Sequence, residues 1–192
     1  MGFMDEVSSG GGVKLLKFDG RAGNYLVRGS EATFNGQEFV VDVYSATGGF
    51  LKFKGKGEPP ERHTGPIFPK DQAPSRASLG DLDRSKWETG KFGDEPEDPW
   101  TPVIEFPLTH RETGEAYTFT AQSKTSLAAA KDFLGLSRRL PESFLPIVRL
   151  DVGSFKGKFG PVKKPVLSMI GKSPIETESN NNELPWDDEP GI

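Results

Sequence analysis

The stretch from Pro102 to Gln122, PVIEFPLTHRETGEAYTFTAQ, sets the fold class of this chain. Two runs rich in β-branched and aromatic residues, 102–109 and 116–122, flank the hexapeptide HRETGE. Strand-like runs joined by a short segment with glycine are typical of a β-hairpin, so Gly114 is expected to serve the turn. Pro107 has no N–H to give to a ladder, which favours a sheet edge or a bulge at that position.

Short strand-like runs on both sides of this hairpin predict further strands. They are residues 13–18, 25–28, 37–45, 50–56, 146–152 and 162–170. The third and fourth runs are separated by Thr-Gly-Gly at 47–49, so we interpret 37–56 as a second hairpin. Pro165 in the last run again favours an edge or a bulge.

One stretch has helical character. Residues 126–136 (SLAAAKDFLGL) place apolar side chains at helical spacing, and Thr125 or Ser126 would serve as the N-cap. The apolar face is expected to consist of Leu127, Ala130, Phe133 and Leu134.

Residues 57–100 form a long insertion that is rich in Gly and Pro and shows no sustained periodicity. Insertions of this length in a compact domain are usually functional or disordered. The rings of Trp87, Phe92 and Trp100 either stack on a ligand or fold back on the body. Folding back is favoured for Trp100, because it enters a predicted strand.

These features predict a mainly β domain over residues 13–172. We expect an OB-like, partly closed β-barrel with one helix and a long irregular loop at 57–100, and a small β-sandwich is the alternative. Residues 1–12 are expected to be a disordered N-terminus. Residues 173–192 hold six carboxylates and no Lys or Arg, so they are expected to form a disordered acidic interaction tail.

The charge is divided unevenly along the chain. There are 24 Lys and Arg against 28 Asp and Glu, a net charge of −4. All 24 basic residues precede the tail, and setting aside the tail's six carboxylates leaves 22 acids, so the body carries +2. The acidic total therefore does not exclude a polyanion as a partner.

The composition bounds the kinds of site that the chain can hold. Without cysteine it has neither a disulfide nor a thiolate metal site, and its two isolated histidines do not suit a His-built zinc site. No apolar run reaches the roughly 18 residues of a membrane-spanning helix. No secretion signal is recognisable at the N-terminus. We therefore expect a cytoplasmic protein with no cofactor and no membrane partner.

Motifs for catalysis are not recognisable in the sequence, which contains no GxSxG, P-loop or HExxH pattern. The chain is therefore not expected to be an enzyme. Four acids in the long insertion, Glu88, Asp94, Glu95 and Asp98, could hold Mg²⁺ in a nuclease. A solvated acidic loop is the favoured interpretation, because no predicted strand or helix fixes these carboxylates.

Two clusters combine rings with cations, one around 50–56 and one around 155–164. Aromatic side chains stack on bases while Lys and Arg follow the phosphates, so both clusters suggest binding of single-stranded nucleic acid. For Phe53 and Phe155, a place in the core is the favoured alternative. The predicted DNA-binding residues are Phe50, Lys52, Lys54, Lys56, Arg62, Trp87, Lys91, Phe92, Arg138, Arg139, Phe155, Lys156, Lys158, Phe159, Lys163 and Lys164.

The end of the chain carries a resemblance. Its last residues, LPWDDEPGI at 184–192, resemble the acidic tip, of the DDDIPF kind, of bacterial and phage single-stranded-DNA-binding proteins. Gly191 and the lack of a final aromatic residue depart from that tip. The segments 86–100, 113–124 and 146–156 also look like phage and prophage proteins of replication or recombination modules.

This resemblance implies an OB-fold protein that binds and protects single-stranded DNA with little sequence preference. It also implies that the protein acts in a bacterial host cytoplasm and can form a homo-oligomer. It also implies that the tail recruits replication or recombination proteins. The tail residues concerned are Trp186, Asp187, Asp188, Glu189, Pro190 and Ile192. Two alternatives stay open: a phage-encoded inhibitor that mimics nucleic acid with its acids, and a metal-dependent nuclease.

Overall fold

The computed structural model describes residues 14–55, 57–90 and 93–175. The predicted N-terminal segment 1–12 and most of the predicted tail lie outside the described residues. The elements, in chain order, are β1 (Lys14–Asp19), β2 (Asn24–Val27), β3 (Glu38–Val41), η1 (Val43–Ser45), β4 (Thr47–Lys52), β5 (Glu61–Pro66), η2 (Arg76–Leu79), η3 (Arg84–Lys86), β6 (Trp100–His110), β7 (Ala116–Ala121), α2 (Lys124–Ser137), β8 (Phe144–Gly157) and β9 (Gly160–Pro174).

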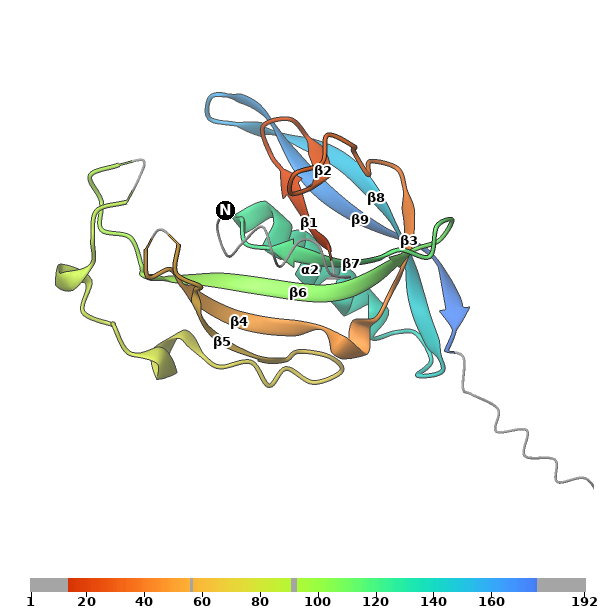
Figure 1. Ribbon diagram of the computed structural model, residues 1–192, viewed down its shortest axis with the longest axis horizontal. Helices are drawn as coiled ribbons and strands as arrows, with labels where there is room; N and C mark the ends of the chain where they lie inside the picture. Colours follow the sequence, from red (N-terminus) through yellow and green to blue (C-terminus); the bar gives the residue numbers. More distant parts are fainter. Residues whose placement is uncertain (1–13, 56, 91–92, 176–192) are drawn as a thin grey trace, which may run out of the picture.

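The described strands form one mixed sheet around β6 (Figure 1). The strand order is β2-β1-β7-β6-β3-β8-β9, and β4 adds to β6 with β5 beyond it. Every pair is antiparallel except β1 with β7. The chain is thus mainly β with one helix, as predicted, and the sheet is not closed, which is consistent with a partly closed, OB-like barrel.

The predicted hairpin at 102–122 is confirmed as β6 and β7. The chain reverses at Gly114, whose φ of 71° is a left-handed value that favours glycine and whose N–H donates to the His110 carbonyl. Pro107 does not lie on an edge strand, because β6 pairs on both sides. It falls instead between the partners Thr47↔Glu105 of β4 and Val41↔Leu108 of β3, where β6 changes its neighbour.

The predicted hairpin at 37–56 is wrong. β3 pairs with β6 and β8, whereas β4 pairs with β5 and β6. The chain turns before the predicted Thr-Gly-Gly segment, at η1, where the Asp42 carboxylate accepts the Ser45 N–H. Gly48 and Gly49 lie inside β4, and a Cβ at Gly49 would stand 2.1 Å from the His63 carbonyl oxygen. Gly49 therefore permits close approach of β5 instead of making the turn.

The insertion at 57–100 contains more structure than predicted. Its first part forms β5, an outer strand that pairs with β4 from Thr47↔Pro66 to Lys52↔Glu61. The sequence of β5, ERHTGP, is polar and contains Gly and Pro, so it lacks a strand signal. Beyond β5, the described residues 67–90 and 93–99 of the insertion have only the short turns η2 and η3 and the bridge Thr89↔Pro96.

The helix α2 begins two residues before the predicted start. Its N-cap is Ser123, whose hydroxyl accepts the Ser126 N–H at 3.2 Å, instead of Thr125 or Ser126. The predicted apolar face is confirmed. Ala130, Phe133 and Leu134 are buried, and Leu127 packs, partly buried, against the core.

The core lies between α2 and the curved sheet, where aromatic rings from three elements meet. Phe106 of β6 stacks on Phe119 of β7 with ring centroids 5.2 Å apart, and the Phe133 ring of α2 lies 5.8 Å from that of Phe106. Each of these three side chains is at least 99% buried. Burial of this order makes these rings large apolar contributors to the stability of the fold.

A single phenol joins the two ends of the curved sheet. The hydroxyl of Tyr25, on β2, donates to the Asp151 carbonyl of β8 at 2.8 Å and accepts the Val166 N–H of β9 at 3.0 Å. No ladder connects β2 to β8 or β9 among the described strands. Burial raises the pKa of Tyr25 well above its ordinary value, so the phenol stays neutral and can both donate and accept.

The last two strands form one long hairpin. The predicted strands 146–152 and 162–170 are confirmed within it, and the Gly-rich segment 153–158 also belongs mostly to β8. β9 is an edge strand, as Pro165 indicates. Ser173 and Pro174 still pair with β8, and the Ile175 N–H donates to the Ser143 carbonyl at 2.9 Å. The tail therefore begins three residues later than predicted, at the earliest at 176.

In the part of the chain that the structure describes, no helix has the length and apolar character to cross a membrane.

Candidate nucleic-acid interface

The β8–β9 hairpin extends beyond the core as an arm, which we define as residues 153–164. In Figure 1 its tip projects past the β1–β2 hairpin at the upper left. The core face of the hairpin ends near the paired residues Leu150 and Leu167, which are both buried. From Val152 to Ile175 the sequence contains five lysines and no Asp or Glu. The arm therefore offers a cationic surface without any acid of its own.

The outer face of the arm carries exposed apolar groups beside a cation. Phe155 pairs with Val162, and Gly153 pairs with Lys164, so these side chains share one face. Phe155 is 42% exposed, so the interpretation that it belongs to the core is wrong: it lies on the face of β8 opposite to the buried Leu150. At the tip Phe159 is 96% exposed, with the Lys158 Nζ 5.4 Å from its ring centroid.

The opposite face of the arm carries Lys156 and Lys163. A Cβ at Gly23, in the β1–β2 turn, would stand 3.0 Å from the Lys163 Cγ, so that turn lies against the arm. The same turn carries Arg21, an exposed cation that no sequence pattern singles out. No ion pair engages Arg21 or any of the four arm lysines within the described segments. These cations are consequently available for phosphate.

Three cations at the other predicted cluster each pair with a carboxylate. Lys52 Nζ lies 2.8 Å from the Asp81 carboxylate and Lys54 Nζ 3.3 Å from that of Glu61. Arg62 likewise pairs with Glu105. Lys56 lies outside the described residues. Lys52, Lys54 and Arg62 thus present little uncompensated positive charge, although ion pairs of this kind are weak enough to be exchanged.

The rings near this second cluster have separate roles. Phe53, for which a core position was favoured, is 60% exposed because β4 ends at Lys52. Phe50 is half-buried and lines a cavity beside α2.

Two tryptophans fasten the long insertion at Asp81. Trp100 is 4% exposed, as its favoured role predicts, and its Nε1 donates to the Asp81 carboxylate at 2.9 Å. Trp87 is half-buried and its Nε1 donates to the Asp81 carbonyl at 2.7 Å. Hydrogen bonds from Lys52 and then Trp100 lower the pKa of the Asp81 carboxyl. Lys91 and Phe92 lie outside the described residues.

The two predicted arginines at the end of α2 differ in their contacts. Arg138 Nε donates to the Pro69 carbonyl and its Nη2 to the Ile67 carbonyl, both at 3.1 Å. Its guanidinium also lies 5.8 Å from the Phe68 ring centroid. Arg138 therefore attaches the segment after β5 to the helix. Arg139 is exposed, and it remains a candidate for phosphate contact.

The acidic residues considered for a metal site are dispersed. Asp98 accepts two hydrogen bonds from the Arg76 guanidinium, and Glu95 pairs with Arg84. No group of three or more His, Cys, Asp or Glu side chains is placed to hold a metal ion within the described ranges.

A scan against protein-family models, a search of curated proteins and a search of solved structures each found no match to this chain. The function is therefore inferred from the residues themselves. The sequence contains one signal for the arm as a phosphate-binding surface, namely the acid-free run around 152–175. Arg21 had no such signal, because its place beside the arm depends on the folding of β1 and β2 against β8 and β9.

Proposed function

We propose that the protein binds single-stranded DNA, largely without sequence preference, along the arm and the adjoining β1–β2 turn. The observation that carries this proposal is the arm itself, which holds four lysines, two exposed phenylalanines and no acid. The tail would recruit replication or recombination proteins. The protein would act in a bacterial host cytoplasm, where it could also form homo-oligomers.

The charge of the arm supports contact with phosphates. Lys156, Lys158, Lys163 and Lys164 lie within nine residues, none pairs with a carboxylate of the described residues, and Arg21 adjoins them. Each phosphate that a lysine neutralises releases condensed counterions, which favours binding at low salt. The same lysines would contact a duplex as well, so charge alone does not select single strands.

The exposed rings supply the preference for single strands. Phe159 and Phe155 present faces on which unpaired bases can stack, whereas the bases of a duplex are already stacked on one another. Stacking of this kind contributes about 1–3 kcal/mol per base and tolerates every base. Binding would therefore depend little on sequence, and no side chain needs to read a base edge.

The tail would compete with the strand for the same cations. Its six carboxylates all lie within residues 176–192, which follow β9, the strand that holds Lys163 and Lys164. Occupation of the arm by DNA would release the tail, which could then present its acidic and apolar end, including Trp186 and Ile192, to a partner protein.

The test is to measure binding of labelled oligo-dT and of a duplex at two salt concentrations, for the full chain and for residues 1–175. We expect salt-sensitive preference for oligo-dT, tighter in the truncated protein because a competing polyanion is gone. Truncation after Ile175 keeps the last hydrogen bond of the β9 end, whereas truncation at 172 removes paired strand residues.

The same titrations separate the alternatives. If neither the full chain nor the truncated protein binds DNA at low salt, the proposal is wrong and an acidic mimic of nucleic acid becomes the better hypothesis. Cleavage of the oligonucleotide that requires Mg²⁺ and is lost in Asp98→Asn with Glu95→Gln would instead support a nuclease.

A further inference from the structure

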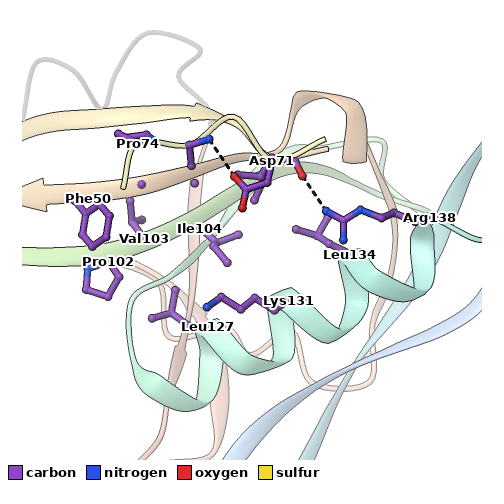
Figure 2. Close-up of a pocket in the computed structure, with 14 residues that line it drawn as sticks. Phe50, Asp71, Pro74, Pro102, Val103, Ile104, Leu127, Lys131, Leu134 and Arg138 are labelled. Atoms are coloured by element: carbon purple, nitrogen blue, oxygen red, sulfur yellow. Dashed lines mark hydrogen bonds between the residues drawn. The ribbon is translucent and has the colours of Figure 1, made fainter. Parts of the chain in front are cut away.

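A cavity of about 400 Å³ lies between α2 and the β4–β6 face of the sheet (Figure 2). The segment after β5, residues 67–74, covers one side of it. This volume is within the range of small-molecule sites, which are roughly 300–1,000 Å³. Phe50 is one of its lining residues, so a residue predicted to contact DNA faces this cavity.

The floor of the cavity is apolar and continuous with the core. Gly48 pairs with Ile104 and Phe50 pairs with Pro102, so these four residues share one face of the sheet. Phe106, two residues beyond Ile104 on the same face, is fully buried under α2. The floor therefore continues the hydrophobic face past the point where the helix covers it. Gly48 lets the Ile67 side chain pack against the floor, because a Cβ at Gly48 would stand 2.8 Å from the Ile67 Cγ2.

The helix side combines apolar groups with cations. Leu127, Lys131, Leu134 and Arg138 recur every three or four residues and thus line one face of α2 (Figure 2). Arg138 is occupied by the carbonyls of Ile67 and Pro69, which holds the covering segment in place. Figure 2 shows the Lys131 side chain directed along the cavity beside Leu127.

The charge of the lining favours an anion. Lys131 forms no ion pair with the described carboxylates. The one carboxylate of the lining, on Asp71, accepts the Ala73 N–H at 3.0 Å within its own segment. With two cations and one acid, the lining carries a net charge of +1.

We propose that this cavity binds a small organic anion with an apolar, ring-sized body. The body would lie on the floor formed by Phe50, Pro102 and Ile104, and the anionic head would contact the ammonium of Lys131. An apolar site with few polar groups suits such a ligand, because the floor supplies affinity and the cation fixes orientation. This site is distinct from the arm and does not depend on DNA binding.

The test uses 8-anilinonaphthalene-1-sulfonate as a fluorescent probe on the full chain, displaced by naphthalene-1-acetate or by its neutral amide. We expect the probe to bind and the acetate to displace it at about tenfold lower concentration than the amide, the difference a charge-assisted contact makes. Lys131→Met should abolish that difference. The matched control, Lys124→Met, changes an exposed lysine of the same helix that does not line the cavity and should preserve it.

A second variant locates the site independently of charge. Leu127→Trp would place an indole in the cavity from a half-buried position of α2 and should weaken the binding of all three compounds. Circular dichroism checks that each variant is folded. The proposal is overturned if acetate and amide displace the probe equally from the unaltered protein, if neither displaces it, or if Lys131→Met behaves like Lys124→Met.

Discussion

The charge of the arm makes a quantitative prediction about salt. Replacing its four lysines, at 156, 158, 163 and 164, by glutamine removes up to four phosphate contacts. Each contact with a single strand contributes about 0.7 to the slope of log K against log salt, so the slope should fall by about 2.8. Between about 50 and about 200 mM salt, the unaltered protein should therefore lose about 50-fold more affinity than the quadruple variant.

The assay is fluorescence anisotropy with labelled oligo-dT over a series of salt concentrations. The matched control carries Lys52→Gln, Lys54→Gln and Arg62→Gln, since these cations already face carboxylates. Its slope should change by less than about 1, because displacing an internal carboxylate releases fewer counterions. Each variant should keep its fold, because the arm lysines are exposed and exposed ion pairs contribute only about 0–1 kcal/mol.

The refuting results are specific. An unchanged slope in the arm variant would exclude the arm as the phosphate-binding surface. If the slope falls more in the control than in the arm variant, the phosphate-binding surface would instead lie on β4 and β5, where the sequence predicted one of the two clusters.

Further predictions concern stacking, closure and acid. Phe159→Ala should weaken oligo-dT binding by about 1–3 kcal/mol without changing the urea midpoint, because the ring is exposed; equal binding would show that it does not stack. Tyr25→Phe should lower the free energy of unfolding in urea by about 1–3 kcal/mol, because it removes the hydrogen bonds of a buried hydroxyl to β8 and β9; an unchanged midpoint would contradict the role of the phenol. Arg138→Met should speed amide exchange in residues 67–73, where Arg139→Met should not; equal rates would contradict the attachment. Hydrogen bonds from Arg149 lower the pKa of the Asp151 carboxyl. The ionised carboxylate therefore stabilises the folded protein at neutral pH, and this contribution is lost as pH falls below about 4. Asp151→Asn should therefore flatten the acid side of a stability–pH curve, and an unchanged curve would refute this assignment.

Local signals predicted the elements whose partners are near in sequence. The β6–β7 hairpin, the helix and both strands of the last hairpin follow from periodicity and from Gly114. The prediction of a hairpin at 37–56 was wrong, because a Gly-Gly pair in the sequence looks the same whether it turns the chain or admits a neighbouring backbone. Only the position of β5 against Gly49 distinguishes the two cases.

The candidate site was predictable to a similar degree. The lysines of the arm were identified because they are close together in the sequence. The ion pairs that neutralise Lys52 and Arg62 were not predicted, because their partners Asp81 and Glu105 lie 29 and 43 residues away in the sequence. The exposure of Phe155 was not predicted either, because which face of β8 meets the core depends on packing between distant strands.

The parallel pairing of β1 with β7 bears on the order of events during synthesis. Lys14 of β1 is the partner of Tyr117, which is made about a hundred residues later. At roughly 5–20 residues per second, the first hairpin therefore waits about 5–20 s on the ribosome before its second neighbour exists. Throughout that interval Leu16, fully buried in the finished protein, has only β2 beside it. Slow translation or early release should therefore expose this hairpin to aggregation or to a chaperone.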